Sequence, residues 1–399
     1  MSLQSVHEHN TGIPLDARET FRGAPAWCQP ILTCISGRPL AGSTPLFTLR
    51  PFAAIAIDLV KYGVGVVTAV LFWQAGGAWY AAMILSWILT VNATRSLTSD
   101  AHYAGHGSVT GHKRLDKVIG DLLSLIALAP NMDDYALPHN RGHHGRIGIG
   151  SSADPDIGLI RVMGIEMGRS LGYYRLRHAL VLISPRYYAV YTLLRLKSTF
   201  ITAPYWRMIV AFFLWGGVAM AAYLTGLVTE TLVALVVPLV WLYAVSAALQ
   251  FPSEHKWLAP QGEDETRGAY LLRVSHGRFF LVPAPDTKLG WPLWAFKMLP
   301  MLFGRFFVCV SILPAHDYHH RNAGCKTWPM EPWLRQSEID RGARYTDYYG
   351  LRAPTHAQFE IWTQTPNASM PQSFSFLSLI LTHLSPKKIE GCSDVDVPT

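Results

Sequence analysis

The sequence has few charged residues and no closely paired cysteines, and both shortages exclude classes of protein. Charged residues make up only 15% of the 399-residue chain, whereas 50% of the residues are hydrophobic and 13 are Trp. This composition is typical of a polytopic membrane protein. The five cysteines are an odd number at scattered spacings without a CxxC pair, so they indicate neither a disulfide framework nor a thiolate zinc site. A reducing cytoplasmic environment fits them.

Concentrated basic tracts and an apolar core near the start are also missing. The net charge of +7 is spread between apolar segments without a nucleic-acid-binding motif, which indicates a membrane-facing surface and no nucleic-acid partner. Residues 1–45 lack the short apolar core of a cleaved signal peptide. We interpret residues 1–45 as a cytoplasmic lead-in, residues 46–325 as a membrane domain and residues 326–399 as a cytoplasmic C-terminal segment.

Long apolar runs predict an all-α integral membrane protein with about four transmembrane helices in two hairpins and a helical cytoplasmic cap. Each run has roughly the 20 residues that are needed to cross a bilayer. The segment 95–197 is rich in Lys and Arg, whereas the hairpin connections contain none, so the positive-inside rule places the hairpin ends on the cytoplasmic side of the cell inner membrane. The paired runs are 52–74 with 78–97, and 205–225 with 229–250.

Four other segments do not predict simple spans. The apolar run 118–130 is too short to cross a bilayer and is expected to cap the spans or re-enter, and 374–384 is also too short. The run 291–313 is long enough but contains Lys, Pro and Arg, so we expect a helix that packs at or partly into the membrane. Between 161 and 207, interleaved Arg and Tyr predict helices at headgroup depth, with a solvated basic loop as the alternative.

Histidines gather in three clusters separated by apolar segments, a pattern that points to metal ligands drawn from distant parts of the chain. Residues three or four apart lie on one face of a helix, and the first and third clusters have that spacing. The middle cluster has an i, i+4, i+5 spacing, which predicts a local distortion and a division of its histidines between two metal ions. The clusters are His102 and His106; His139, His143 and His144; and His316, His319 and His320.

A ninth histidine, His255, follows the second predicted hairpin, and its position alone leaves a ligand and an ordinary core residue equally open. Neutral imidazole binds iron, zinc, copper and nickel alike. The number of histidines is more informative, because nine exceed the needs of one tetrahedral zinc ion and suit two ions of higher coordination. The isolated histidines are interpreted as ordinary surface or core residues; they are His112, His178, His276 and His356.

The three clusters resemble the histidine boxes of the membrane fatty acid desaturase and hydroxylase superfamily. That family is marked by HxxxH, by HxxHH or HxxxHH, and by a final HxxHH, which match residues 102–106, 139–144 and 316–320. The resemblance covers roughly residues 50–325. Shorter stretches also match the family: Gly107-Ser108, Asp154-Pro155-Asp156 and Glu254-His255.

The resemblance implies four membrane-spanning helices under a cytoplasmic cap and a non-haem centre of two iron ions held by histidine. It also implies O2 as co-substrate for attack on an unactivated C–H bond, and it makes His255 a metal ligand beside the three clusters. The sequence shows no fused electron-carrier domain, so an external reductase with a ferredoxin-like or small haem protein is expected to supply electrons. Residues 321–328 replace the apolar, proline-containing stretch of many lipid-acting members, so substrate identity does not carry over.

The expected reaction is desaturation of a fatty acyl chain or lipid, and the same site leaves hydroxylation or ketolation of a lipid, isoprenoid or other apolar metabolite open. A histidine-rich metal transporter would share the apolar helices, but it would carry its ligands inside the spans rather than after them. A membrane zinc protease is disfavoured because the sequence has no HExxH. Residues 148–153 superficially match a dinucleotide-binding fingerprint, but no strand precedes them and a loop is expected.

Overall fold

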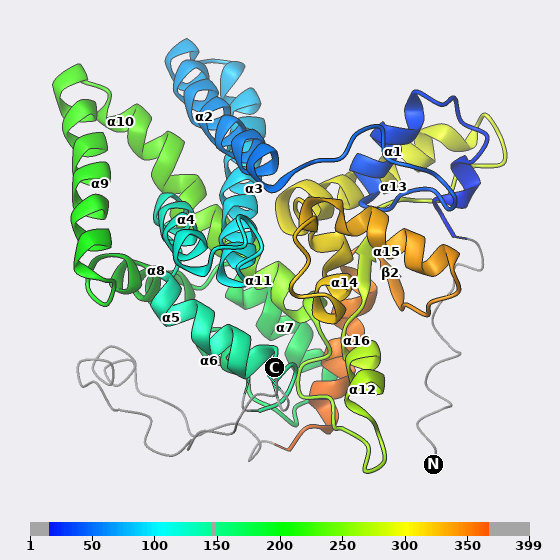
Figure 1. Cartoon of the computed structure of the whole chain (residues 1–399). Coiled ribbons are helices and arrows are strands. Elements are labelled where there is room, and N and C mark those ends of the chain that lie inside the picture. Colours follow the sequence, from blue (N-terminus) through cyan, green and yellow to red (C-terminus); the bar gives the residue numbers. More distant parts are fainter. Residues whose placement is uncertain (1–15, 146–147, 153, 367–399) are drawn as a thin grey trace.

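The computed structural model describes residues 16–145, 148–152 and 154–366. The described chain is mostly helical, as predicted, and its β structure is one two-stranded sheet. Figure 1 shows long helices standing together on one side, with shorter helices packed below and beside them. The predicted short apolar run 374–384 lies outside the described residues.

Among the described residues, three helices are long and apolar enough to cross a membrane. Large apolar side chains on them face outward; Phe212 is 70% exposed and Phe213 is 72% exposed. Exposed apolar surface on this scale marks contact with lipid in a membrane protein. The three helices are α2 (Pro51–Ala75), α9 (Tyr205–Thr225) and Val228–Glu254, which comprises α10 (Val228–Thr231), η5 (Leu232–Leu242) and α11 (Tyr243–Glu254).

The predicted second span, 78–97, lies in α3 (Trp79–Gly105) except for its first residue, and here the structure differs from the expectation. α3 packs along α2 but is not among the helices apolar enough to count as a span. Polar side chains explain the difference, since they pair inside the helix bundle; Asn92 Oδ1 accepts from Lys61 Nζ at 3.0 Å. α3 also continues unbroken beyond position 97 and so carries the first histidine cluster about two turns further.

The predicted membrane-associated run 291–313 is broken. Helices α13 (Gly290–Phe303) and η6 (Gly304–Val308) bend by 91° into the segment Leu313–Arg321, and this pair raises the candidate spans from three to four if it is counted as one. The Arg305 guanidinium stabilises the break by donating to the backbone carbonyls of Cys309 and Ser311, which lie within it. Because of the bend, the third histidine cluster returns toward the other two instead of continuing away from them.

The Arg- and Tyr-rich segment forms helices α7 (Leu171–Val181) and α8 (Pro185–Phe200), as predicted. Two of the tyrosines, Tyr174 and Tyr187, do not present their rings at the protein surface. Both rings are buried, and both O–H groups donate to backbone carbonyls at 2.9 Å. These tyrosines find their polar partners inside the protein and not in the lipid headgroups.

Shorter elements complete the fold. α4 (Lys113–Ile126), which contains most of the run predicted to be too short to span, packs its apolar face on α3. Strand β1 (Gly277–Phe279) pairs in parallel with β2 (Asp347–Tyr349). The other elements are η2 (Glu19–Phe21), α1 (Cys28–Ser36), α5 (Met132–Leu137), η3 (Pro138–His143), η4 (Pro155–Ile157), α6 (Gly158–Val162), α12 (Arg267–Val274), η7 (Leu313–Ala315), α14 (His316–Arg321), η8 (Trp328–Met330), α15 (Glu331–Asp340) and α16 (Arg352–Gln364).

Candidate metal centre

All nine predicted ligands converge below the long helices. They come from the end of α3, from η3 and the residue after it, from the residue that ends α11, and from α14. Seven of the nine are buried, and His106 and His144 are partly exposed. The converging histidines are His102, His106, His139, His143, His144, His255, His316, His319 and His320.

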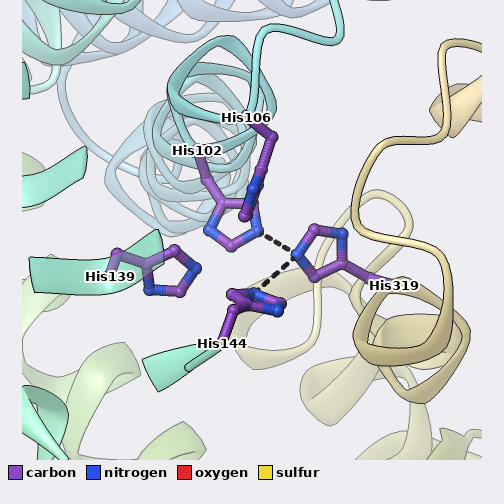
Figure 2. A group of neighbouring side chains, drawn as sticks. All are labelled: His102, His106, His139, His144 and His319. Atoms are coloured by element: carbon purple, nitrogen blue, oxygen red, sulfur yellow. Dashed lines mark hydrogen bonds between the residues drawn. The ribbon is translucent and has the colours of Figure 1, made fainter. Parts of the chain in front are cut away.

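Five of these histidines form one compact group, drawn in Figure 2. One ring nitrogen from each lies within 4.8 Å of those of the other four. His319 Nε2 is 2.8 Å from His102 Nε2 and 3.1 Å from His144 Nε2 (Figure 2). We call this set group A; its members are His102, His106, His139, His144 and His319.

A second group adjoins the first. His320 Nε2 lies 3.1 Å from the Nε2 atoms of both His255 and His316. His143 lies between the two groups, because one of its ring nitrogens is within 4.8 Å of ring nitrogens of both His144 and His320. We call His143, His255, His316 and His320 group B.

The middle histidine box owes its geometry to a π-helical turn. The backbone N–H of His144 donates to the His139 carbonyl at 2.9 Å, a bond from residue i to residue i−5. The wider turn brings His144 back beneath His139 within group A and leaves His143 directed at group B. The predicted local distortion is confirmed, and its physical origin is this single π turn.

A buried carboxylate orients His143. The His143 Nδ1–H donates to Asp154 Oδ2 at 2.8 Å, and Asp154 also accepts from the backbone N–H groups of Gly150 and Asp156. Burial opposes protonation, but the hydrogen bond with Asp154 and the charge of Asp156 raise the pKa of His143 above its ordinary value. Since Asp154 holds the Nδ1 proton, His143 presents the lone pair of Nε2 to the cluster.

The remaining imidazoles outside the spans are held neutral. Burial and the neighbouring histidines lower the pKa of His144 to about 2 and that of His139 well below its usual range. Burial, followed by the charge of His143, lowers the pKa of His106 to about 4. Neutral rings are the form in which histidine binds metal.

Unpaired nitrogens in group A test whether a metal ion fits. His106 Nε2 and both ring nitrogens of His139 are buried without a hydrogen-bond partner among the described residues. A buried polar atom without a partner costs about 1–3 kcal/mol, so such atoms are few in folded proteins. Several neutral nitrogens that face one another at close range suit a bound divalent cation, which would satisfy them together. The residues present therefore fit a metal site.

Sequence reasoning missed two residues that support the third box. The Tyr103 O–H donates to Glu331 Oε2 at 2.6 Å, and Glu331 Oε1 is 3.9 Å from His319 Nδ1. Burial raises the pKa of Glu331 well above its usual range, which favours the neutral form of this carboxyl group. Glu331 is 228 positions from Tyr103 and lies in the segment predicted to be a cytoplasmic C-terminal segment. No motif or residue spacing near it in the sequence indicated a role at the site.

Asp317, inside the third box, is fixed by a buried ion pair. Arg335 of α15 donates to both of its carboxylate oxygens at 2.8 Å. This bidentate pair locks α14 against α15 and thereby sets the direction of the three histidines on α14.

The four isolated histidines lie outside the cluster, as predicted. His178 Nε2 and His276 Nε2 contact backbone carbonyls at 3.0 and 2.9 Å, His112 is exposed, and His356 lies 3.5 Å from the carboxylate of Glu360. Burial is the main cause that lowers the pKa of His276, to about 3. The described part of the glycine-rich stretch 148–153 is a loop, also as predicted.

A family model for "Fatty acid desaturase" matches residues 77–281, slightly more than half of the chain. The chain belongs to the fatty acid desaturase family. It is therefore an oxidoreductase of the membrane desaturase type. The matched region includes the first two histidine boxes and His255 but ends before the third box, which the structure brings to the same place. No curated protein matches the sequence.

Proposed function

We propose that this member of the desaturase family catalyses the O2-dependent oxidation of an unactivated C–H bond, with desaturation of a fatty acyl chain as the reaction. The observation that carries the proposal is the convergence of nine histidines, with no carboxylate among the five of group A, in two adjoining groups. Neutral imidazole suits iron, and membership of the desaturase family favours iron over zinc.

In this proposal the two groups hold two iron ions. Group A would hold one ion and group B the other, so the middle box divides its histidines between them, with His143 on one side and His139 and His144 on the other. Bound iron would supply the activation of O2 and the removal of hydrogen from the substrate. The protein's own part is to hold the ligands and to keep water away from them.

Several residues of this chain perform that part. Asp154 keeps the proton of His143 on Nδ1, and the Tyr135 hydroxyl, 2.6 Å from His102 Nδ1, orients that ring in the same way. Most of the cluster is buried, which excludes bulk water. His106 and His144 are the partly exposed members, so an external electron donor, a ferredoxin-like or small haem protein with its reductase, would approach from their side.

In the proposed orientation the long helices span the cell inner membrane, and the nine histidines lie on its cytoplasmic side. None of the nine candidate ligands lies inside one of the three unbent candidate spans, which supports an enzyme over a metal transporter.

Product analysis tests the proposal. The full chain is expressed in a host of known lipid composition, and the lipids are examined by mass spectrometry for loss of two hydrogens or gain of one oxygen. A new double bond supports desaturation, whereas a new alcohol or ketone would replace it with hydroxylation or ketolation. His143→Ala is expected to abolish the product and to lower the iron content, and His112→Ala, at an exposed histidine, is the matched control. Retained zinc, metal flux and no oxidation would contradict the proposal.

A further inference from the structure

The N-terminal segment packs against the chain that leads into the third histidine box. Figure 1 shows α1 beside α13, and apolar side chains of the two helices share one core. Beyond α1, Arg305 Nε donates to the carbonyl of Cys34 at 2.9 Å. Gly37, at φ 74°, lies so close to Pro314 that an added Cβ would be 2.5 Å from a side-chain carbon of that proline. Pro314 lies in η7, directly before α14, so the N-terminal segment contacts the start of the box.

A chain of alternating charges continues from this contact to the box itself. Arg38 pairs with Asp16 at 2.9 Å and with Asp347 of β2 at 2.6 Å. Asp347 also pairs with Arg335 of α15. Arg335 in turn holds both carboxylate oxygens of Asp317 at 2.8 Å, and Asp317 is the second residue of the third box. Arg38 and Asp347 are 309 positions apart in the sequence, so folding alone joins the two ends.

The inner part of this chain is buried and held in place. Arg335 and Asp317 are each 1% exposed, and Arg38 is 8% exposed. The Cζ atoms of Arg38 and Arg335 lie 5.3 and 5.0 Å from the centroid of the same ring, that of Phe279 in β1. Removal of one partner from a buried ion pair leaves the other charge uncompensated. A change at Arg38 therefore acts on the groups that remain.

Two carboxylates compete for one nitrogen of Arg335. Its Nη2 contacts both Asp317 Oδ2 and Asp347 Oδ1, and its Nε donates to Asp317 Oδ1. Arg38 balances the charge of Asp347. Without Arg38, Arg335 would be the only cation within ion-pair distance of Asp347 among the described residues. The attraction of Asp347 would then draw Arg335 away from Asp317.

A displacement of α14 affects the two histidine groups unequally. α14 supplies His316 and His320, two of the four members of group B. It supplies only His319 to group A, whose other four members come from α3, the residue after it, η3 and the residue after that. Group B therefore depends more strongly on the direction of α14.

We propose that Arg38 is a positioning residue of the metal centre. It neutralises Asp347, which leaves Arg335 free to hold Asp317 through two donors. Asp317 in turn fixes the direction in which α14 presents its histidines to group B. The inference rests on the proposed function in taking group B as the site of one of two metal ions. The N-terminal segment then supports the metal centre directly.

Cobalt(II) binding to Arg38→Gln tests this role. Cobalt(II) stands next to iron(II) in the affinity series of divalent ions, and its visible spectrum changes with ligand geometry. The metal-free full chain, in detergent under nitrogen, is titrated with cobalt(II) against a competing chelator. One of the two bound ions is expected to weaken about tenfold, with a shifted spectrum, since loss of a residue that orients ligands costs about 10–100-fold in metal affinity. The other ion should change by less than about twofold, since α14 supplies one of its five candidate ligands.

Arg18→Gln is the matched control. Arg18 is a buried arginine of the same segment, 1% exposed, and its guanidinium donates to the backbone carbonyls of Arg38 and Gln29 and to the side-chain oxygen of Gln29. This variant should lower Tm without shifting the cobalt spectrum. An equal shift in Arg18→Gln and Arg38→Gln would overturn the proposal, because the effect would then come from a loosened N-terminal segment.

The double variant Arg38→Gln/Asp347→Asn separates positioning from a general loss of stability. Asn at position 347 carries no charge, so Arg335 is no longer drawn away from Asp317 and cobalt binding should return close to that of the wild type. Losses of affinity that add in the double variant would overturn the proposal. If Arg38→Gln does not fold, a double variant that folds and binds cobalt supports the proposal, and one that does not fold overturns it.

The same proteins distinguish a failure of this inference from a failure of the proposed function. A wild type that binds two ions with this dependence on Arg38, but oxidises no substrate, would support the positioning role and refute the proposed function. Product formation by the wild type, with cobalt binding unchanged in Arg38→Gln, would refute the positioning role and leave the proposed function standing.

Discussion

Replacement of Asp154 by Asn tests how strongly a buried carboxylate controls the candidate metal centre. The two side chains have nearly the same size, so Asp154→Asn keeps the packing and removes the charge. The Asp154 side chain is fully buried and accepts the His143 Nδ1 proton at 2.8 Å. A charge-assisted hydrogen bond of this kind contributes about 1.5–3 kcal/mol, which corresponds to roughly tenfold to a hundredfold in metal affinity.

The assay is iron binding to the purified apoprotein, measured against a competing chelator across pH. Protons compete with iron for His143, and Asp154 raises the pKa of His143. Iron affinity of the wild type should therefore fall as pH drops through that raised pKa. In Asp154→Asn the pKa of His143 is lower than in the wild type. The variant's iron affinity should therefore be reduced at neutral pH, and its further decrease on acidification should begin at a lower pH than in the wild type. Asp133→Asn, at an exposed aspartate, is the control. Affinity within twofold of wild type and an unshifted pH profile would refute the role of Asp154.

Three further predictions concern stability. Glu331→Gln should lower Tm less than Tyr103→Phe, because a neutral Glu331 resembles Gln. In Tyr103→Phe the missing hydroxyl leaves the buried Glu331 Oε2 unpaired, at a cost of about 1–3 kcal/mol. The reverse order of Tm values would show that Glu331 is ionised. Gly65→Val should destabilise the α2–α3 pair by about 1–3 kcal/mol, since a Cβ added at Gly65 meets Thr90 Oγ1 at 2.5 Å. Gly63→Val is the control and should cost less, because the space around Gly63 is open. Equal losses of Tm in the two variants would argue against the close contact between the helices. Removal of iron with a chelator should lower Tm. When free iron is present at a hundredfold excess over its Kd, its removal costs about 2.7 kcal/mol in the free energy of unfolding. The original Tm should return only when iron is added back, and an unchanged Tm would mean that no metal stabilises the fold.

Much of the candidate site could be predicted from local spacing. The helical repeat places His102 with His106 on one face, and the offset of one residue in the middle box indicated a distortion that the structure shows as a π turn. Apolar run length likewise identified α2, α9 and the helix that ends at Glu254. These features depend on neighbours within a few residues, which a sequence displays directly.

Other features depended on contacts between distant segments. Residues 78–97 were expected to form a membrane span, but the pairing of Asn92 with Lys61 lets α3 carry polar residues inside the bundle. Tyr174 and Tyr187 were expected among lipid headgroups, and their rings are buried inside the protein. In each case a partner far along the chain supplies the hydrogen bond, and composition alone does not show which partner will be near.

The sequence by itself determined the class of protein, the family and eight of the nine candidate ligands, because composition, run length and histidine spacing are local properties. The ninth candidate, His255, came from the family resemblance. Only the tertiary structure decided how those ligands divide into two groups, and it alone brought Glu331 to His319. The physical reason is chain folding itself: α3, η3, α11 and α14 meet through a bent helix and a π turn, and the distances between their side chains exist only after they have packed.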